Sequence, residues 1–334
     1  MAHRLSAFVM FLSVCVIVAV TAFVGSRSAS AQETFPDRPI HMIVPYAPGG
    51  QFDLHARVLA AKMKDYLGQP VLVENKPGAA TTLGATYVAQ SKNDGYTLLF
   101  SGANALSVAP HQFKNLPYKV SDFQPISMVN LLSQGFMINT KVIPAKTLVE
   151  FVAYVKERPG KFSYGTSGTG GSQHMLGEHL KAVFGLDMVQ VGYRGSPEVR
   201  QELVAGQIAM AIDGLVAYLP QMQPNGPLLT LAVNGRQRIE AAKDVPTFEE
   251  LGYPQMTSGS WGGILAPAGT PKEVIDKLHK AIVEANNSPE IRARVIRDAA
   301  TPLTNTPEEF AKIIQEDSVK WGELVARLPP MKAQ

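Results

Sequence analysis

Two glycine-rich loops, each lying between an apolar strand-like run and a helix-like run, constrain the fold of this chain more than any other feature. The first loop, PYAPGGQFD at residues 45–53, follows the β-branched run 40–44. The second loop, GTSGTGGSQH at residues 165–174, follows the run 162–164. The start of a helix offers unpaired N–H groups and the positive end of a dipole, so each loop is suited to hold an anion. One such loop in each half of the chain predicts an anion bound between two domains.

Strand-like and helix-like runs alternate along the chain, which is typical of an α/β fold. Residues 53–67 carry apolar residues at helical spacing and are closed by Gly68. The runs at 71–74 and 96–100 predict strands, and residues 83–91 predict a helix. After residues 123–129 the pattern restarts, with helices expected at 148–156, 173–184 and 197–205 and strands at 161–164, 188–191, 208–212 and 228–233.

The C-terminal part continues the pattern with a strand near 264–266 and helices over 272–285, 288–299 and 307–328. Thr270 is expected to cap the first of these helices and Pro271 to be its first residue. The near-continuous apolar strands indicate sheets covered by helices. We therefore predict two α/β lobes, each a mixed, mainly parallel sheet flanked by helices. The first lobe comprises residues 32–129 and 260–334, and the second, residues 130–259, is inserted into it.

The N-terminal segment has the pattern of an export signal. His3 and Arg4 precede an apolar stretch from about residue 7 to residue 24, and Ala29-Ser30-Ala31 supplies a small-residue cleavage site. We expect residues 1–31 to be a signal peptide that is cleaved near Ala31. An uncleaved N-terminal anchor is the alternative, because the apolar stretch is nearly long enough to span a bilayer.

Composition excludes several functional classes. Cys15, inside the expected signal peptide, is the only cysteine, so disulfides, thiolate zinc sites and cysteine catalysis are not expected in the mature protein. Without residues 1–31 the chain holds 29 basic and 28 acidic residues, a net charge of +1, which is too balanced for nucleic-acid binding. About 300 residues favour two domains, and no second apolar run approaches membrane-spanning length, so a soluble mature protein is expected.

The second loop resembles a phosphate-binding loop without its lysine. Its spacing fits G-x-x-x-x-G-K-[ST], but Gly171 occupies the lysine position, so nucleotide hydrolysis is not expected. The backbone and the hydroxyls of Thr166, Ser167, Thr169 and Ser172 suit a carboxylate. The alternative interpretation is a glycine-rich turn that is needed only for its backbone angles.

A serine hydrolase is a second interpretation of the same loop. His174 would act as the base for Ser167 or Ser172, and Asp213 would orient it. The nucleophile elbow G-x-S-x-G is incomplete, however, and His174 could instead make a local hydrogen bond. No HExxH motif or carboxylate cluster accompanies the histidines, so no metal is expected.

The first loop lacks G-x-G-x-x-G, which argues against a dinucleotide cofactor. Asp53 lies in the expected first helical turn, where it either caps N–H groups or pairs with a ligand ammonium or orders water. Arg194 either clamps a carboxylate or lies solvated at the surface. Phe52 and Trp261 either line a cleft or are packed in the core.

Short motifs that recur in a fixed order carry a resemblance to a known family. The chain resembles the periplasmic solute-binding proteins of tripartite tricarboxylate transporters, the Bug-type receptors, over nearly all of its mature length. The motifs are PDRPI at 36–40, PGG at 48–50 with Asp53, LGQPV at 67–71, ENKPGA at 74–79, DGYTLL at 94–99, LPY at 116–118, PGK at 159–161, YG at 164–165 with His174, DVPT at 244–247 and APAGTP at 266–271.

The resemblance implies a type II periplasmic-binding-protein fold with a ligand cleft between the lobes. It implies that backbone amides, hydroxyls and bridging waters hold a carboxylate. The expected ligand-binding residues are Tyr46, Pro48, Gly49, Gly50, Gln51, Phe52, Asp53, Ser101, Asn104, Thr166, Ser167, Gly168, Thr169, Ser172, His174, Tyr193, Arg194, Gly195, Ser196 and Asp213. The chain departs from the family pattern where Ala80-Thr81 replaces the usual glycines, Ala109-Pro110 an Asn-Pro and Ala209 an acidic residue. The first two departures are expected near the edge of the cleft and leave the identity of the ligand open.

The expected function is that of a periplasmic receptor, not an enzyme. It would close by hinge motion around a small organic mono- or dicarboxylate, and two membrane subunits of the transporter would recognise the closed form. No cofactor, no nucleic-acid partner and a monomeric state are expected. The alternatives are a secreted serine hydrolase and a receptor that feeds a signalling protein.

Overall fold

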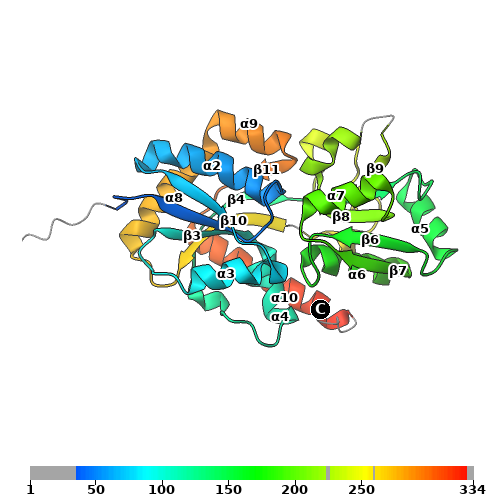
Figure 1. The fold of residues 1–334 in the computed structure, drawn as a ribbon, viewed down its shortest axis with the longest axis horizontal. Coiled ribbons are helices and arrows are strands. Elements are labelled where there is room, and N and C mark those ends of the chain that lie inside the picture. The colour runs from blue at the N-terminus through cyan, green and yellow to red at the C-terminus, as the bar shows by residue number, and fades with distance from the viewer. Residues whose placement is uncertain (1–34, 223–225, 259, 329–334) are drawn as a thin grey trace, which may run out of the picture. The chain divides into compact units, whose positions relative to one another are not determined.

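Two β-sheets organise the chain from Arg38 onward, as Figure 1 shows for the computed structural model. The structure describes residues 35–222, 226–258 and 260–328, so the expected signal peptide and its cleavage site lie outside the described residues. Within these ranges, no helix combines the length and the apolar character that crossing a bilayer requires.

The first sheet has six strands in the order β11-β4-β10-β3-β1-β2. Its strands are β1 (Ile40–Val44), β2 (Val71–Asn75), β3 (Thr97–Gly102), β4 (Phe123–Leu132), β10 (Ser260–Pro267) and β11 (Ala300–Pro302). Its main helices are α2 (Gln51–Leu67), α3 (Thr82–Ala89), α4 (Ala109–Gln112), α8 (Lys272–Asn287), α9 (Pro289–Arg297) and α10 (Pro307–Arg327). Helices α2, α8 and α9 pack together on one face of this sheet, and α3, α4 and α10 lie on the other (Figure 1). We call this sheet and its helices the first lobe.

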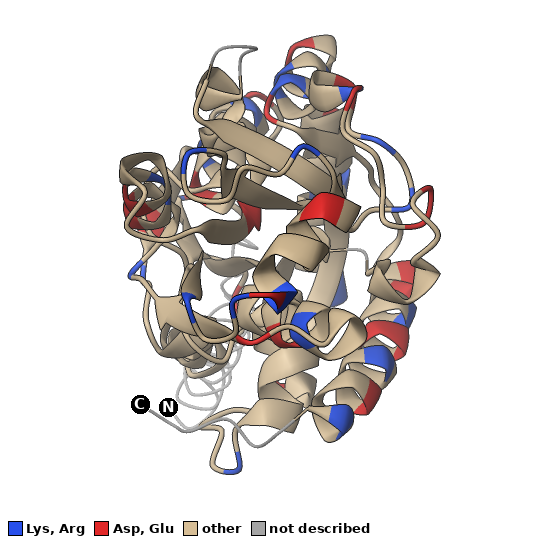
Figure 2. Cartoon of the chain, turned by 90° about the vertical axis from the view of Figure 1, so that its right-hand side faces the viewer, with Lys and Arg blue, Asp and Glu red and all other residues tan. Residues whose placement is uncertain are grey.

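The second sheet has five strands in the order β7-β6-β8-β5-β9 and forms, with its helices, the second lobe. Its strands are β5 (Gln134–Asn139), β6 (Phe162–Thr166), β7 (Met188–Gly192), β8 (Met210–Gly214) and β9 (Leu228–Val233). Its helices are α5 (Leu148–Lys156), α6 (Ser172–Phe184) and α7 (Ser196–Ala205). On the face of the molecule shown in Figure 2, basic and acidic residues are interspersed and do not form the one-sign stripe typical of nucleic-acid binding.

Both sheets are mixed, as predicted, and most of the described strands of each sheet run in one direction, which agrees with the predicted mainly parallel character. Among the described strands, β1 pairs in parallel with β2 and β3, and β6 pairs in parallel with β7 and β8. The pairs β10–β3, β10–β4, β11–β4, β5–β8 and β5–β9 are antiparallel. Strands β4, β5 and β10 carry the chain between the sheets. Because β10 is antiparallel to both β3 and β4, β4 runs in the direction of β1–β3, and β10 and β11 run against these four strands. In the second sheet β5 runs against β6, β7, β8 and β9.

Local sequence signals explain most helix ends. Gly68 ends α2 with φ of 72°, and its N–H donates to the Lys64 carbonyl at 2.9 Å, as the glycine predicts. At the start of α8 the prediction is wrong, because Pro271 is the capping residue and helix α8 begins at Lys272. The Thr270 hydroxyl donates to the Pro267 carbonyl at 2.7 Å and so stabilises the turn before the helix.

The core of the first lobe includes both aromatic and polar anchors. The Trp261 ring meets Phe310 edge-on at 5.1 Å, and its Nε1 donates to Asp317 at 2.9 Å. Trp261 is thus packed in the core and does not line a cleft. Gly263 has no side chain at the point where the Phe310 ring crosses β10, since an added Cβ would lie 2.2 Å from that ring.

A buried histidine in α2 makes the stability of the fold depend on pH. Asn130 donates to His55 Nδ1 at 2.7 Å, and the described residues offer His55 Nε2 no partner. Burial lowers the pKa of His55 from 6.5 to about 4, whereas Asp298 raises it and Arg294 lowers it. Between these values the unfolded chain binds the proton and the folded chain does not. Stability is therefore complete above about pH 6.5 and is lost as the pH falls toward 4.

The variant His55→Gln isolates this effect, because it carries no titratable group there. The free energy of unfolding of the wild type relative to the variant should fall by about 3 kcal/mol between about pH 7 and pH 4. Urea unfolding of both proteins at each pH gives this difference, from which the contributions of shared groups cancel. A difference that does not change with pH would contradict the assignment.

Candidate functional site

A cavity of about 360 Å³ lies between the two lobes and is lined by both. From the first lobe it is lined by Pro45, Tyr46, Ala47, Gly50, Gln51, Phe52, Pro77, Gly78, Ala79, Ala80 and Thr81. Gln134 contributes at the start of β5, where the chain passes between the sheets. From the second lobe it is lined by Ser167, Gly168, Thr169, Gln173, Gly192, Tyr193, Arg194, Gly195, Ser196, Asp213 and Gly214.

Helix starts from both lobes converge on this cavity. The capping residue of α3, the first residue of α2 and the first residue of α7 (Thr81, Gln51 and Ser196) all line it. The first turn of α6 contributes Gln173. Each start brings the positive end of a helix dipole toward the same space, which favours an anion. Among the described lining residues, only Arg194 and Asp213 are of ordinarily charged types, so the backbone dominates the electrostatics.

Ring stacking and Asp53 hold the first loop in place. Tyr46 stacks on Phe52 with ring centroids 4.0 Å apart and an interplanar angle of 7°. Burial raises the pKa of the Tyr46 hydroxyl to about 12, although hydrogen bonds with Ser101 and Gly102 act to lower it. Asp53 does not line the cavity.

The Asp53 carboxylate is fully engaged in local contacts. It accepts hydrogen bonds from Gly49 N at 2.8 Å and Asn75 Nδ2 at 2.9 Å, and Arg57 lies 2.9 Å away. Burial acts to raise the pKa of this carboxyl, but the contacts with Arg57, Gly49 and Asn75 bring it below its ordinary value. Of the two interpretations of Asp53, the geometry supports the one in which it orders the N–H groups of the loop.

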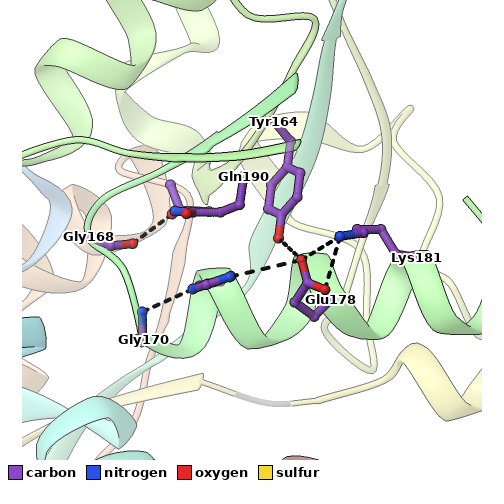
Figure 3. A network of polar contacts seen from close by, with 8 residues as sticks. Tyr164, Gly168, Gly170, Glu178, Lys181 and Gln190 are labelled. Atoms are coloured by element: carbon purple, nitrogen blue, oxygen red, sulfur yellow. Dashed lines mark hydrogen bonds and ion pairs between the residues drawn. The ribbon is translucent and has the colours of Figure 1, made fainter. Parts of the chain in front are cut away.

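A polar network anchors the second loop (Figure 3). Thr166 Oγ1 donates to the Gly168 carbonyl at 2.7 Å and accepts from Gln190 Nε2 at 2.8 Å. Gly170 N donates to His174 Nδ1 at 3.0 Å. The other ring nitrogen of His174 lies 3.9 Å from Glu178, which also accepts from Tyr164 and Lys181. Thr166 and His174 therefore position the loop and do not themselves line the cavity.

The three side chains required by a serine hydrolase are not arranged as a catalytic unit. The Asp213 carboxylate accepts hydrogen bonds from Ser196 at 2.9 Å, Gly214 N at 2.8 Å and Tyr218 at 3.0 Å, not from His174. His174 Nδ1 already accepts from Gly170 N, and burial lowers the pKa of His174. Burial raises the pKa of Asp213 to about 6, although its three donors act to lower it.

The lobes touch at the rim of the cavity. A Cβ added at Gly195 would lie 2.6 Å from the Ala47 Cβ, and one added at Gly50 would lie 3.9 Å from the Ser196 hydroxyl. On another side, Ser172 N donates to Asn104 Oδ1 at 2.7 Å. These contacts join the first loop to the start of α7 and α6 to the first lobe. The two lobes are therefore in contact on two sides of the cavity.

Residues 55–329 match the family model described as the tripartite tricarboxylate transporter family receptor. The chain belongs to this family. BugT of Bordetella pertussis is 35% identical over 306 residues, which cover 91% of this chain and 93% of BugT. A solved structure described as a periplasmic transporter matches with a TM-score of 0.84 and 40% identity, covering 88% of this chain and 98% of the other. MatC from Rhodopseudomonas palustris, solved with bound malate, matches with a TM-score of 0.81 and 30% identity, covering 87% of this chain and 100% of MatC.

The family resemblance, the two-lobed α/β fold and the receptor role expected from the sequence are thereby confirmed. The structure divides the predicted site residues of this receptor into two groups. Those that line the cavity are Tyr46, Gly50, Gln51, Phe52, Ser167, Gly168, Thr169, Tyr193, Arg194, Gly195, Ser196 and Asp213. Those that do not are Pro48, Gly49, Asp53, Ser101, Asn104, Thr166, Ser172 and His174. Several of the second group hold the loops in place through the contacts described above.

Several lining residues are absent from the expected site residues: Pro45, Ala47, residues 77–81, Gln134, Gln173, Gly192 and Gly214. Residues 77–81 follow β2 and contain the PGA of a quoted motif, and the glycine could have indicated a turn directed at the ligand. Gln134 carries no recognisable signal, because its place depends on where the chain passes between the sheets. Within residues 35–222, 226–258 and 260–328, no group of three or more His, Cys, Asp or Glu is placed to hold a metal ion.

Proposed function

We propose that this receptor captures a small organic carboxylate in the cavity between its lobes and presents it in the closed form to two membrane subunits of a tripartite tricarboxylate transporter. The observation that carries the proposal is the convergence of the starts of α2, α3 and α7 on one cavity. The malate bound to MatC, a relative of 30% identity, supports a carboxylate as the class of ligand.

The proposed binding residues are the cavity-lining residues of the two glycine-rich loops, of 193–196 and of Asp213. Closure removes water from the ligand, and hydrogen bonds from backbone N–H and hydroxyl groups to a carboxylate are then stronger than in water. The proposed lobes are residues 32–129 with 260–334 and residues 130–259. The chain passes to the second sheet after Leu132, at the end of β4, and enters β10 of the first sheet at Ser260, close to these limits. Export to the periplasm with cleavage near Ala31 and a monomeric state complete the proposal.

Titration calorimetry of the purified protein against a panel of carboxylates tests the ligand class. The panel contains straight-chain mono- and dicarboxylates of about three to six carbons. We expect at least one member to bind with a dissociation constant in the micromolar range or below and to be recovered unchanged. Binding of no member would contradict the proposal.

An esterase and amidase screen in parallel tests the hydrolase alternative. The receptor function predicts no turnover by the wild type. Turnover that is lost in Ser167→Ala or Ser172→Ala, without a tight ligand that is recovered unchanged, would overturn the receptor proposal. Pull-down of the receptor, with ligand, against the two membrane subunits or a sensor protein then separates a role in transport from a role in signalling.

A further inference from the structure

In the part of the chain that the structure describes, the backbone crosses between the two sheets at two places, and both crossings are short. The first crossing is Ser133, the single residue between the end of β4 at Leu132 and the start of β5 at Gln134. The second leads from Ser258 into β10, which begins at Ser260. Leu132 and Ser260 pair with each other in the antiparallel ladder of β4 and β10. On the side of the first lobe, the sheet therefore holds the two crossings together.

On the side of the second lobe, one asparagine holds both crossings. Asn234 directly follows β9 and is 1% exposed. Its Oδ1 accepts from Gln134 N at 2.7 Å, and its own N–H donates to the Gln134 carbonyl at 3.1 Å. Its Nδ2 donates to the Ser258 hydroxyl at 2.9 Å, and its carbonyl accepts from Ser258 N at 3.0 Å. Asn234 thus makes two hydrogen bonds to each crossing.

The contacts of the Asn234 side chain require both an acceptor and a donor. The Gln134 N–H can only donate, so the amide oxygen faces it, and the amide nitrogen is left to donate to the Ser258 hydroxyl. Gln134 is buried, and a buried N–H without a partner is costly, so loss of the side chain would favour a shift of the first crossing. The next residue, Gly235, packs closely on this crossing, since an added Cβ would lie 2.1 Å from the Ser133 hydroxyl oxygen.

Between these anchors, little chain is left to bend. In the first crossing only Ser133 separates the paired Leu132 from the anchored Gln134. The second crossing is anchored at Ser258 and is paired in the first sheet two residues later. A hinge this short restricts the two lobes to few relative orientations. Gln134 also lines the cavity, so the same anchor sets the position of a lining residue.

We infer that Asn234 is a positioning residue for ligand binding, because it limits bending to these short stretches and so fixes how the two halves of the cavity meet. This inference rests on the proposed function, in which loops from both lobes hold one carboxylate. A ligand that contacts both lobes binds more tightly when their orientation is fixed beforehand, since less motion is lost on binding. Without Asn234 the crossings bend independently, and fewer molecules hold the two loops in the arrangement that binds.

Two substitutions remove the anchor, and a matched substitution does not. Asn234→Ala frees both crossings, whereas Ser258→Ala removes a single hydrogen bond and carries the test if Asn234→Ala does not fold. The matched control is Asn139→Ala, because Asn139 is 2% exposed and lies at the other end of β5. Asn139 donates to the Leu203 carbonyl at 2.8 Å and accepts from Lys141 N at 2.9 Å. The control therefore also loses buried hydrogen bonds of the second lobe, at the end of the strand away from the crossings.

Spin labels on one exposed residue of each lobe report the relative orientation of the lobes. Without residues 1–31 the chain contains no cysteine, so introduced cysteines are labelled selectively. Val319 of α10 and Val149 of α5, which are 58% and 69% exposed, are suitable sites. Pulsed electron paramagnetic resonance of the ligand-free protein then gives the distribution of distances between the labels. We expect a broader distribution in Asn234→Ala than in the wild type, an intermediate one in Ser258→Ala and the wild-type width in Asn139→Ala.

Calorimetry with the acid that binds best measures the effect on affinity. Asn234→Ala should weaken binding roughly tenfold, because the apparent affinity falls with the fraction of molecules that are competent to bind. Ser258→Ala should weaken binding less, and Asn139→Ala should bind as the wild type does. Urea unfolding should show a comparable loss of stability in Asn234→Ala and Asn139→Ala, so that the loss of affinity does not follow stability.

A distance distribution in Asn234→Ala as narrow as that of the wild type would overturn this inference, whatever the affinity. A loss of affinity in Asn139→Ala as large as that in Asn234→Ala would also overturn it. Either result, with carboxylate binding by the wild type, would leave the proposed function intact. Binding of no carboxylate by the wild type would overturn the proposed function, and this inference with it.

Discussion

Replacing Gly195 by alanine should weaken ligand binding roughly tenfold or more, because the added methyl group prevents the lobes from closing. Its Cβ would lie 2.6 Å from the Ala47 Cβ of the opposite lobe, well inside van der Waals contact. Gly195 has φ of 176°, which is extended backbone that alanine adopts without strain, so the effect is a steric one between the lobes. Overpacking of this kind costs about 1–3 kcal/mol. Calorimetry with the best-binding acid measures the loss.

A compensating variant distinguishes closure from other effects. Ala47→Gly removes the methyl group that the new side chain would meet, so the double variant Gly195→Ala/Ala47→Gly should recover most of the affinity. Urea unfolding of Gly195→Ala should stay close to that of the wild type, since the contact is made between the lobes. Wild-type affinity in Gly195→Ala, or no recovery in the double variant, would show that this contact does not limit closure.

Carboxylate binding should be accompanied by proton uptake at Asp213. This carboxyl lines the cavity, and burial raises its pKa to about 6 in this structure, outweighing the donors Ser196, Gly214 and Tyr218. A bound anion in the same cavity raises that pKa further, because two negative charges repel. Below about pH 6 Asp213 is protonated in both states and affinity is at its highest. As the pH rises above 6, affinity falls by up to about tenfold per pH unit until the pKa of the bound state is passed.

Calorimetry between about pH 6.5 and 8.5, in two buffers with different ionisation enthalpies, measures the protons taken up. Burial lowers the pKa of His174, beside the second loop, below its ordinary value of 6.5, so this histidine stays neutral across the window. Asp213→Asn is the matched variant, since its amide oxygen can still accept from Ser196 and Gly214. Its affinity should not depend on pH. A wild-type affinity that is constant across the window would rule out Asp213 as the linked group.

The elements whose apolar residues recur at a clear helical or strand spacing could be predicted from the sequence. Residues 53–67 show helical spacing and a closing glycine, and helix α2 ends at Leu67 as expected. The strands β4, β5 and β11 are not among the predicted elements. Strand β5 follows β4 after a single residue, and β11 is only three residues long. Whether a strand stays in one sheet or passes to the other is decided by packing at long range, which a local pattern does not record.

In the candidate site, too, some residues could be predicted from local patterns, and the roles of others depend on partners that only the fold supplies. The two glycine-rich loops were found because glycine marks places where backbone must approach a ligand. His174 and Asp213 have the residue types of a catalytic pair, and only their partners, Gly170 and Tyr218, show that each serves its own local network. Ala80-Thr81 is expected near the cleft edge only as a departure from the family pattern, and the structure places both residues in the cavity lining.

The most direct test of the central claim is a crystal structure of the receptor with the acid that binds best. We predict one carboxylate of that acid in the cavity between the lobes, within hydrogen-bond distance of backbone N–H groups at the starts of α2 and α7. The same structure should show Gly195 against Ala47. An acid bound outside this cavity, or held there mainly by Arg194 with no backbone N–H in contact, would contradict the claim.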